Sequence, residues 1–494
     1  WQECSPSTIP DFSAAAYFFG RDLFQHQNIP IGLINTSWGG TIAEAWMSAE
    51  SAETLPEFTG KVKEIKAETE VQQKQIYLDK LTKWEEKITA VDSGYKNKVA
   101  IWTETNFDDS SWKTMSLPGT WEKKLSYNFD GIAWFRKQVT IPANWAGKDL
   151  KLSFGVIDNN DITFFNGEKI GSTEGNTTPR EYIIPARLVK SGTAVITVRV
   201  LDLAGEGGFY GEKMSLGLSD SEKTLLTGDW KCKFGAGLKA LSPVPTPISQ
   251  NPNRPTVLYN AMIHPLVPYS IRGAIWYQGE SNAGRSYQYR EIFPLMIKDW
   301  RKQWNKDLPF YFVQLANYMK IDENPVESGW AELREAQTQT LNLGNTGMAV
   351  IIDIGETNDI HPKNKQEVGR RLALAARANT YGEKIAFSGP IYTSSKIEGN
   401  KIRISFKHTN DGLKTKDGQP LKGFAMAGSD HKFHWAEATI VGNEVVVSCP
   451  EVPSPLAVRY AWGNNPICNL YNGAGLPASP FRTDDWQGIT FGKK

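Results

Sequence analysis

Short apolar runs alternate with amphipathic stretches over two parts of the chain. Continuous apolar runs, typical of strands buried in a parallel sheet, occupy residues 31–35, 271–278, 309–317 and 348–355. Apolar residues recur at helical spacing in residues 13–25, 41–50, 287–304, 330–342 and 364–379. This repetition of strand and helix predicts an α/β domain whose parallel sheet is covered by helices on both faces.

Three residues mark expected helix boundaries. Thr41 is the expected N-cap of the helix over 41–50, and Glu44 stands three places later, as in a capping box. Pro294 is expected to interrupt the helix over 287–304. Pro362 is expected at the first helical position of the last helix, where proline is favoured.

The remaining residues follow other patterns. Residues 56–92 place apolar side chains at helical spacing among many charges, which predicts a long helix or a helical pair. Residues 98–240 alternate apolar and polar positions around an Asn-Gly hairpin signal, and short strands return from residue 386. We therefore expect an α/β domain from residues 1–50 and 245–382, a helical insertion at 56–92, a β-sandwich insert at 98–240 and a C-terminal β-sandwich domain at 386–494.

Composition excludes several classes of protein. A chain of 494 residues is too long to fold around a single hydrophobic core, so two to four domains are expected. Lys and Arg number 55 against 54 Asp and Glu, which argues against a nucleic-acid or anionic-membrane surface. No apolar run reaches the roughly 18 residues of a membrane span. The four cysteines lack zinc-site spacing, and Cys449 and Cys468 either pair or stay free. The seventeen tryptophans favour a carbohydrate ligand only slightly.

Chemically informative residues follow three of the expected strands. The sequences NTSWGGT, QGESN and GETNDIHP come directly after the strands at 31–35, 271–278 and 348–355. Ligands of open parallel sheets bind beyond the carboxyl ends of the strands. Three such loops with glycines, amides, acids and a histidine predict a binding site at this edge.

His361 is the strongest catalytic candidate in these loops. Only six histidines occur in the chain, and His361 stands two places after Asp359. A histidine beside an acid can take a proton from a nucleophile while the acid fixes its tautomer. The alternative is a histidine that merely caps the following helix. The strand-end position of the pair favours the catalytic interpretation.

The other candidates carry less specific signals. Gly39 and Gly40 offer backbone N–H groups to an oxyanion, or simply form a tight turn. Gln278 and Asn282 bring amide donors, and Glu280 is either structural or a second acid for the histidine. The nucleophile is not evident: Ser37 resembles part of a G-x-S-x-G elbow without its first glycine, and Ser281 is unsupported. Metal hydrolysis is disfavoured, because no HExxH occurs.

Long stretches of the sequence resemble the sialate O-acetylesterases, a branch of the SGNH hydrolases. They occur in the family's order: PIGLINTSWGGTIAEAW, AMIHPLVPYSIRGAIWYQGESNA, LREAQ, DIHPKNKQEVGRRLALAARA, LAVRYAW and GLPASPF. The resemblance implies a three-layer SGNH-hydrolase-like domain. WFRKQVTIP, FFNGEKIG and GEGGFYG in residues 98–240 resemble jelly-roll, galactose-binding-like modules of glycosidases, for which we expect a structural role.

The resemblance also implies roles for individual residues. His361 is the general base, Gly40 the oxyanion-loop glycine, and Gln278 or Asn282 a further oxyanion donor. The family's acid stands three residues before the histidine, where this chain has Asn358, so Asp359 or Glu280 takes that role. The family's nucleophile lies in a GQSNM motif upstream of the stretch matching WQECSP. This motif is absent here, so we expect the serine before residue 1, with Ser37 as the second candidate.

We therefore expect a carbohydrate O-acetylesterase without metal or cofactor, acting on an acetylated sugar or glycan. Sialate 9-O-acetyl groups are the first candidate substrate, and xylan or another acetylated polysaccharide is the alternative. A glycan-binding protein without a nucleophile is the alternative from another class. The family resemblance suggests an extracytoplasmic location, whether periplasmic, secreted or lysosomal.

Overall fold

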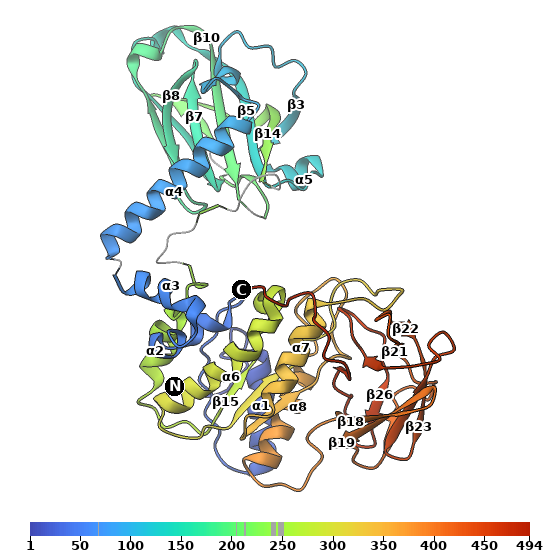
Figure 1. Ribbon diagram of the computed structural model, residues 1–494. Coiled ribbons are helices and arrows are strands. Elements are labelled where there is room, and N and C mark those ends of the chain that lie inside the picture. The colour runs from blue at the N-terminus through green and yellow to red at the C-terminus, as the bar shows by residue number, and fades with distance from the viewer. Residues whose placement is uncertain (68, 204, 212–213, 239–243, 246–250) are drawn as a thin grey trace. The chain divides into compact units, whose positions relative to one another are not determined.

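The chain forms two compact units. The computed structural model describes residues 1–67, 69–203, 205–211, 214–238, 244–245 and 251–494 (Figure 1). One unit consists of residues 1–67 and 252–494, and the other of residues 68–251. The boundary between them falls inside the expected helical insertion, which forms two helices, α3 (Pro56–Ala67) and α4 (Glu70–Val91). The finer domain limits expected from the sequence stay a prediction.

A three-stranded parallel sheet organises the first unit. Strands β15 (Ala274–Trp276), β16 (Phe310–Val313) and β17 (Thr346–Ala349) pair in this order, with Ala274 opposite Phe310 and Phe310 opposite Thr346. Helices α6 (Ser286–Gln303) and α7 (Gly329–Thr340) connect these strands, and α8 (Lys365–Asn379) follows them. The expected mixture of helix and sheet is confirmed.

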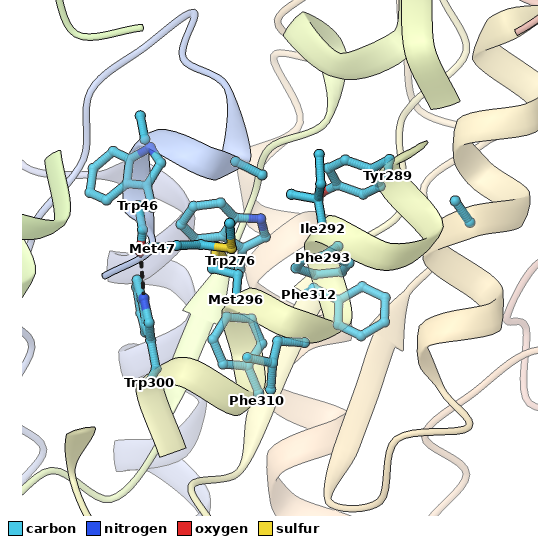
Figure 2. Close-up of a cluster of buried hydrophobic side chains, with 14 of the residues drawn as sticks. Trp46, Met47, Trp276, Tyr289, Ile292, Phe293, Met296, Trp300, Phe310 and Phe312 are labelled. Atoms are coloured by element: carbon cyan, nitrogen blue, oxygen red, sulfur yellow. Dashed lines mark hydrogen bonds between the residues drawn. The ribbon is translucent and has the colours of Figure 1, made fainter. Parts of the chain in front are cut away.

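Alternating side chains of β16 bury both faces of this sheet. Phe310 and Phe312 pack in one cluster with residues of α6 and α7. Tyr311 and Val313 pack in another cluster with residues of α8 and of α1 (Ala14–Gln27). Figure 2 shows the first cluster, in which the indole Nε1 of Trp300 donates to the carbonyl of Trp46 at 2.8 Å. Helices therefore contribute to the core on each face of the sheet.

The expected strand at 31–35 does not form. These residues are extended but half-exposed, and no backbone hydrogen bond joins them to another described segment. Leu33 instead fills the space beside Gly20 of α1, where an added Cβ would lie 2.6 Å from its Cδ1 atom. A strand requires a hydrogen-bonded neighbour, and an apolar run alone does not supply one.

Three helix expectations were also wrong. Residues 41–50 form a short 3₁₀ turn, η1 (Ala43–Trp46), and a separate turn, α2 (Ala49–Ala52), because the Glu44 side chain is directed to buried partners and closes no capping box. Helix α6 continues through Pro294. Asn364, not Pro362, begins α8: its Oδ1 accepts the backbone N–H of Glu367 at 3.1 Å.

The described residues of the second unit form two six-stranded antiparallel sheets, whose buried side chains share one core, and a two-stranded sheet of β1 and β2. Asn166 and Gly167 turn the chain at positive φ between β7 and β8, as the sequence predicts. The elements after α4 are β1 (Tyr95–Lys96), β2 (Val99–Ala100), β3 (Lys113–Leu117), β4 (Gly119–Thr120), α5 (Trp121–Leu125), β5 (Gly131–Ile141), β6 (Leu150–Asp158), β7 (Asn160–Phe165), β8 (Glu168–Thr173), β9 (Pro179–Ile184), β10 (Gly192–Asp202), β11 (Gly208–Phe209), β12 (Ser215–Gly217), β13 (Lys223–Leu225) and β14 (Gly228–Gly237).

Short antiparallel strands follow α8 in the first unit. They form two four-stranded sheets and a two-stranded one around a core of their own. These strands are β18 (Ile391–Glu398), β19 (Lys401–Lys407), β20 (Leu413–Thr415), β21 (Phe424–Ala427), β22 (His434–Trp435), β23 (Glu437–Val441), β24 (Glu444–Ser448), β25 (Ala457–Tyr460), β26 (Leu470–Asn472) and β27 (Phe481–Arg482). Cys449 and Cys468 are both free thiols. Among the described residues, no helix is long and apolar enough to span a membrane.

Candidate active site

His361 lies on the surface, in the loop that follows β17. Its side chain is 82% exposed, and its Nδ1 atom is 3.4 Å from Oδ1 of Asp359. The backbone N–H of His361 donates to the same oxygen at 2.9 Å. This hydrogen bond is the main reason that the pKa of Asp359 is lowered. Asp359 thus holds both the backbone and the ring of His361 in one orientation.

Glu280 follows β15, and the fold brings it near His361. Burial raises the pKa of the Glu280 carboxyl, while the charges of His361 and Lys365 partly oppose this effect. Lys365, at the start of α8, also lies over the ring of Tyr277, with its Nζ atom 5.3 Å from the ring centre. Residues from two strand ends therefore meet, as the sequence predicts for loops at one edge of a parallel sheet.

Replacing Glu280 by glutamine is expected to stabilise the protein at neutral pH. Because burial raises the folded-state pKa of this carboxyl above its ordinary 4.5, its ionised form destabilises the folded state. That penalty is complete above the folded-state pKa and disappears as the pH falls below 4.5. Glu280→Gln should therefore raise the free energy of unfolding at pH 7, and this gain should disappear as the pH falls below 4.5. Urea unfolding of both proteins between pH 4 and pH 8 measures the difference, and a gain that grows toward acid pH would contradict the expectation.

Gln278 is engaged inside the protein. Its Nε2 atom donates to the carbonyl of Thr41 at 2.9 Å and to Oδ1 of Asn282 at 2.6 Å. Its Oε1 atom accepts the hydroxyl of the buried Tyr289 at 2.9 Å. Both amide hydrogens are therefore used to hold the chain around Thr41, and neither is directed to a bound oxyanion in this arrangement.

Asn282 continues the same network and is fully buried. Its Oδ1 atom also accepts the backbone N–H of Ala43 at 3.0 Å, and its Nδ2 atom donates to Glu44 at 3.1 Å. The other carboxylate oxygen of Glu44 accepts Arg285. The role of Glu44 was missed from the sequence, where its spacing from Thr41 resembled a capping box. Gln278, Asn282 and Glu44 together fix the position of the Gly39-Gly40 turn relative to β15.

The Gly39-Gly40 turn is exposed, and its backbone conformation requires glycine at one position. Gly40 has φ +71°, although a Cβ atom there would meet nothing within 4 Å. Nearby, Ser37 donates its hydroxyl to Oδ1 of Asn35 at 2.9 Å. The backbone of this turn is therefore open to solvent, and Ser37 has no hydrogen bond to His361 among the described residues.

A buried ion pair anchors the loop that carries His361. Asp353, just after β17, makes a bidentate pair with Arg371 of α8, with distances of 2.6 and 2.9 Å. Arg371 also donates to the carbonyl of Val350 at 2.6 Å, and the Tyr471 hydroxyl donates to Asp353 at 2.8 Å. Burial alone would raise the pKa of Asp353, but the hydrogen bonds from Arg371 outweigh it and lower that pKa. This pair, which sequence patterns did not reveal, fixes the start of the loop. Among the described residues, no group of three or more His, Cys, Asp or Glu side chains is arranged to hold a metal ion.

Part of the chain matches a known esterase family. Residues 238–378 match the family described as carbohydrate esterase, sialic acid-specific acetylesterase. The sialate O-acetylesterase of Mus musculus is 36% identical over 270 residues, which cover 48% of this chain and 49% of the mouse protein. That of Homo sapiens is 30% identical over 275 residues, covering 50% of this chain and 52% of the human protein. The chain therefore spans about half the length of the curated relatives it matches.

A solved structure is also similar. It is described as a novel carbohydrate acetylesterase from Xanthomonas citri and is 31% identical, with a TM-score of 0.46. The alignment covers 71% of this chain and 100% of the Xanthomonas citri chain. The resemblance to the sialate O-acetylesterase family that the sequence motifs indicate is confirmed by the family match and the curated relatives.

Proposed function

From the match of residues 238–378 to the sialic acid-specific acetylesterases, we propose that this chain acts as a serine carbohydrate O-acetylesterase. The observation that carries the proposal is the pair of His361 and Asp359, whose ring nitrogen and carboxylate oxygen lie 3.4 Å apart in a strand-end loop of the matched segment. The acetylated substrate is a sugar or glycan, and sialic acid is the first candidate because it is named for the relatives.

The proposed reaction has two steps. A serine hydroxyl attacks the acetyl carbonyl carbon while His361 takes the serine proton and passes it to the departing sugar oxygen. His361 then takes a proton from water as the water oxygen attacks the acetyl carbonyl carbon. The bond to the serine oxygen breaks, His361 returns the proton to that oxygen, and acetate is released. Asp359, with its carboxylate 3.4 Å from the His361 ring nitrogen, is the proposed orienting acid. Glu280 contributes its negative charge from a longer distance.

The oxyanion site is proposed at the Gly39-Gly40 turn. Its exposed backbone is the part of the candidate site available to a developing negative charge. Gln278 and Asn282 were expected to donate directly. Their hydrogen bonds to Thr41, Ala43 and Glu44 support a positioning role instead.

The finer fold assignment is also a proposal. The parallel sheet with helices packed on each face supports an SGNH-hydrolase-like three-layer domain. The two antiparallel sheets of residues 68–251 support a jelly-roll insert of the galactose-binding-like type.

Acetate release tests the proposed activity. The intact protein should release acetate from an aryl acetate and from 9-O-acetylated sialic acid, and an acetylated xylo-oligosaccharide serves as the competing substrate. Ser37→Ala should retain at least half of the wild-type rate, since Ser37 hydrogen-bonds Asn35 rather than a base. Thr36→Ala is the matched control for disturbance of this loop. Complete loss of activity on Ser37→Ala alone would make Ser37 the nucleophile.

A further inference from the structure

A pocket of about 290 Å³ lies in the first unit, apart from the His361 loop. Its wall on one side is formed by residues 325–327 of the connection between β16 and α7. Residues around β21, β22 and β25, in the C-terminal part of the chain, also line the pocket. Figure 1 labels β21 and β22. This volume is at the small end of the range for ligand pockets, roughly 300–1,000 Å³. The pocket is therefore suited to a single ring rather than to a large ligand.

Arg459 lines the pocket, and two carboxylates balance its positive charge. Its Nε and Nη2 atoms donate to Asp484 at 2.9 and 3.0 Å, and its Nη1 atom donates to Glu327 at 2.6 Å. The guanidinium lies 4.1 Å from the ring centre of Phe433 and 5.0 Å from that of Trp462. Two carboxylates thus neutralise Arg459, which disfavours an anion as the ligand.

Trp435 supplies an open aromatic face. Its side chain lines the pocket and the residue is 46% exposed, yet its Nε1 atom donates to the carbonyl of Glu323 at 2.8 Å. This bond holds the ring against the connection between β16 and α7. A fixed, exposed indole is a stacking surface that loses little conformational entropy when a ligand binds.

Trp462 leaves a polar group without a partner. It lines the pocket and is 7% exposed, and its buried Nε1–H has no hydrogen-bond acceptor among the described residues. Because this nitrogen is covered by protein atoms, a ligand in the pocket does not reach it, and Trp462 offers only apolar ring surface to a ligand. The exposed ammonium of Lys432 and the carboxylate of Glu327 add a donor and an acceptor at the pocket wall.

The connection between β16 and α7 links this pocket to the His361 loop. Near its start, the backbone N–H of Met319 donates to the carbonyl of Thr357 at 3.1 Å. Asn465 reinforces the contact, because its Nδ2 atom donates to Met319 at 2.7 Å and to Thr357 at 3.1 Å. From Met319 the chain reaches Pro325 at the pocket within roughly 20 Å, even if fully extended. A chain of a few sugar units spans such a distance.

We propose that this pocket binds an uncharged sugar ring of the glycan whose acetylated unit is processed at His361. The aromatic face of Trp435 and the donor and acceptor of Lys432 and Glu327 match a pyranose, which has apolar C–H faces and a rim of hydroxyls. The inference rests on the proposed esterase function and adds to it that the substrate is an oligosaccharide or polysaccharide rather than a free monosaccharide.

Binding and kinetics of Trp435 variants test the proposal. Isothermal titration of the intact protein with unacetylated xylohexaose, cellohexaose and 3′-sialyllactose measures affinity. For a bound oligosaccharide, Trp435→Ala should weaken affinity by roughly tenfold, whereas Trp435→Phe should keep most of it. With an acetylated form of that oligosaccharide as the substrate, the Trp435→Ala protein should have a higher KM and a nearly unchanged kcat. Its hydrolysis of an aryl acetate should be unaffected. Val441→Ala, an exposed apolar position of β23, is the control.

The outcomes separate the two proposals. Absence of binding to all three oligosaccharides, or binding that Trp435→Ala leaves unchanged, overturns the sugar pocket. Oligosaccharide binding that depends on Trp435 in a protein without acetylesterase activity supports the pocket and overturns the esterase. Thermal unfolding of Trp435→Ala checks that the loss is not unfolding, and rescue by Trp435→Phe gives the same check independently.

Discussion

Replacement of His361 by alanine is expected to lower kcat for acetate release roughly 10²–10⁴-fold, the usual contribution of a general base. The affinity for substrate should change little, because the base acts in the transition state. The exposed position of His361 also means that its removal leaves no cavity, so the thermal unfolding midpoint should stay near that of the unchanged protein.

His26 offers a matched control for this experiment. Its Nδ1 atom lies 3.3 Å from Asp22, so it too is a histidine beside an acid, but this pair is on helix α1 and its Asp22 is largely buried. His26→Ala should leave kcat unchanged. If the two variants have equal activity, His361 is not the base. Asp359→Ala and Glu280→Ala, measured beside them, identify the orienting acid: the larger fall in kcat is expected for Asp359→Ala.

Replacement of Asp353 by alanine is expected to reduce the free energy of unfolding by about 1–3 kcal/mol, the cost of leaving the buried donors of Arg371 and Tyr471 without their acceptor. Glu367 still accepts the Arg371 Nε–H at 2.7 Å, so the guanidinium keeps one charge partner. Asp353 and Arg371 are 7% and 6% exposed, so water cannot replace the lost carboxylate. Urea unfolding measures the loss. Glu398→Ala removes one partner of the more exposed Arg403 pair and should cost less than about 1 kcal/mol.

The same ion pair predicts a pH dependence. Because the folded-state pKa of Asp353 is lowered, its stabilising effect is complete above the ordinary value of 3.8 and is lost as the pH falls through the folded-state pKa. Asp353→Asn should therefore be most destabilising near neutral pH and least so in strong acid. A destabilisation that does not depend on pH would mean that packing, rather than charge, explains the role of Asp353.

Sequence patterns predicted the parts of the fold that repeat locally. The apolar runs at 271–278 and 309–317 contain β15 and β16, and the amphipathic stretches at 330–342 and 364–379 match α7 and α8 closely. The run at 348–355 shares only residues 348–349 with β17, so that strand was placed too late in the sequence. The run at 31–35 has the same composition, but a strand also depends on a neighbour that composition cannot reveal. The proline in α6 shows a related limit, since tertiary packing around Phe293 and Met296 holds the helix together past it.

For the candidate site, topology was more informative than residue type. The rule that strand ends share one edge brought Glu280 and His361 together. It could not tell whether an amide faces solvent or the interior, and for this reason Gln278 and Asn282 were expected to donate to substrate. Their partners, Thr41 and Glu44, are more than 200 residues away in sequence, and no local pattern relates them.

The discontinuous first unit has a consequence for the order of folding during synthesis. Trp46 and Phe58 share a core with Trp276 and Trp300, which the ribosome adds only after the whole of residues 68–251. At roughly 5–20 residues per second, the early segment waits on the order of ten seconds or longer for its partners. The intervening unit has its own core and can fold during that interval. Nascent chains therefore expose the Trp46 region throughout this interval, which gives a chaperone time to bind there.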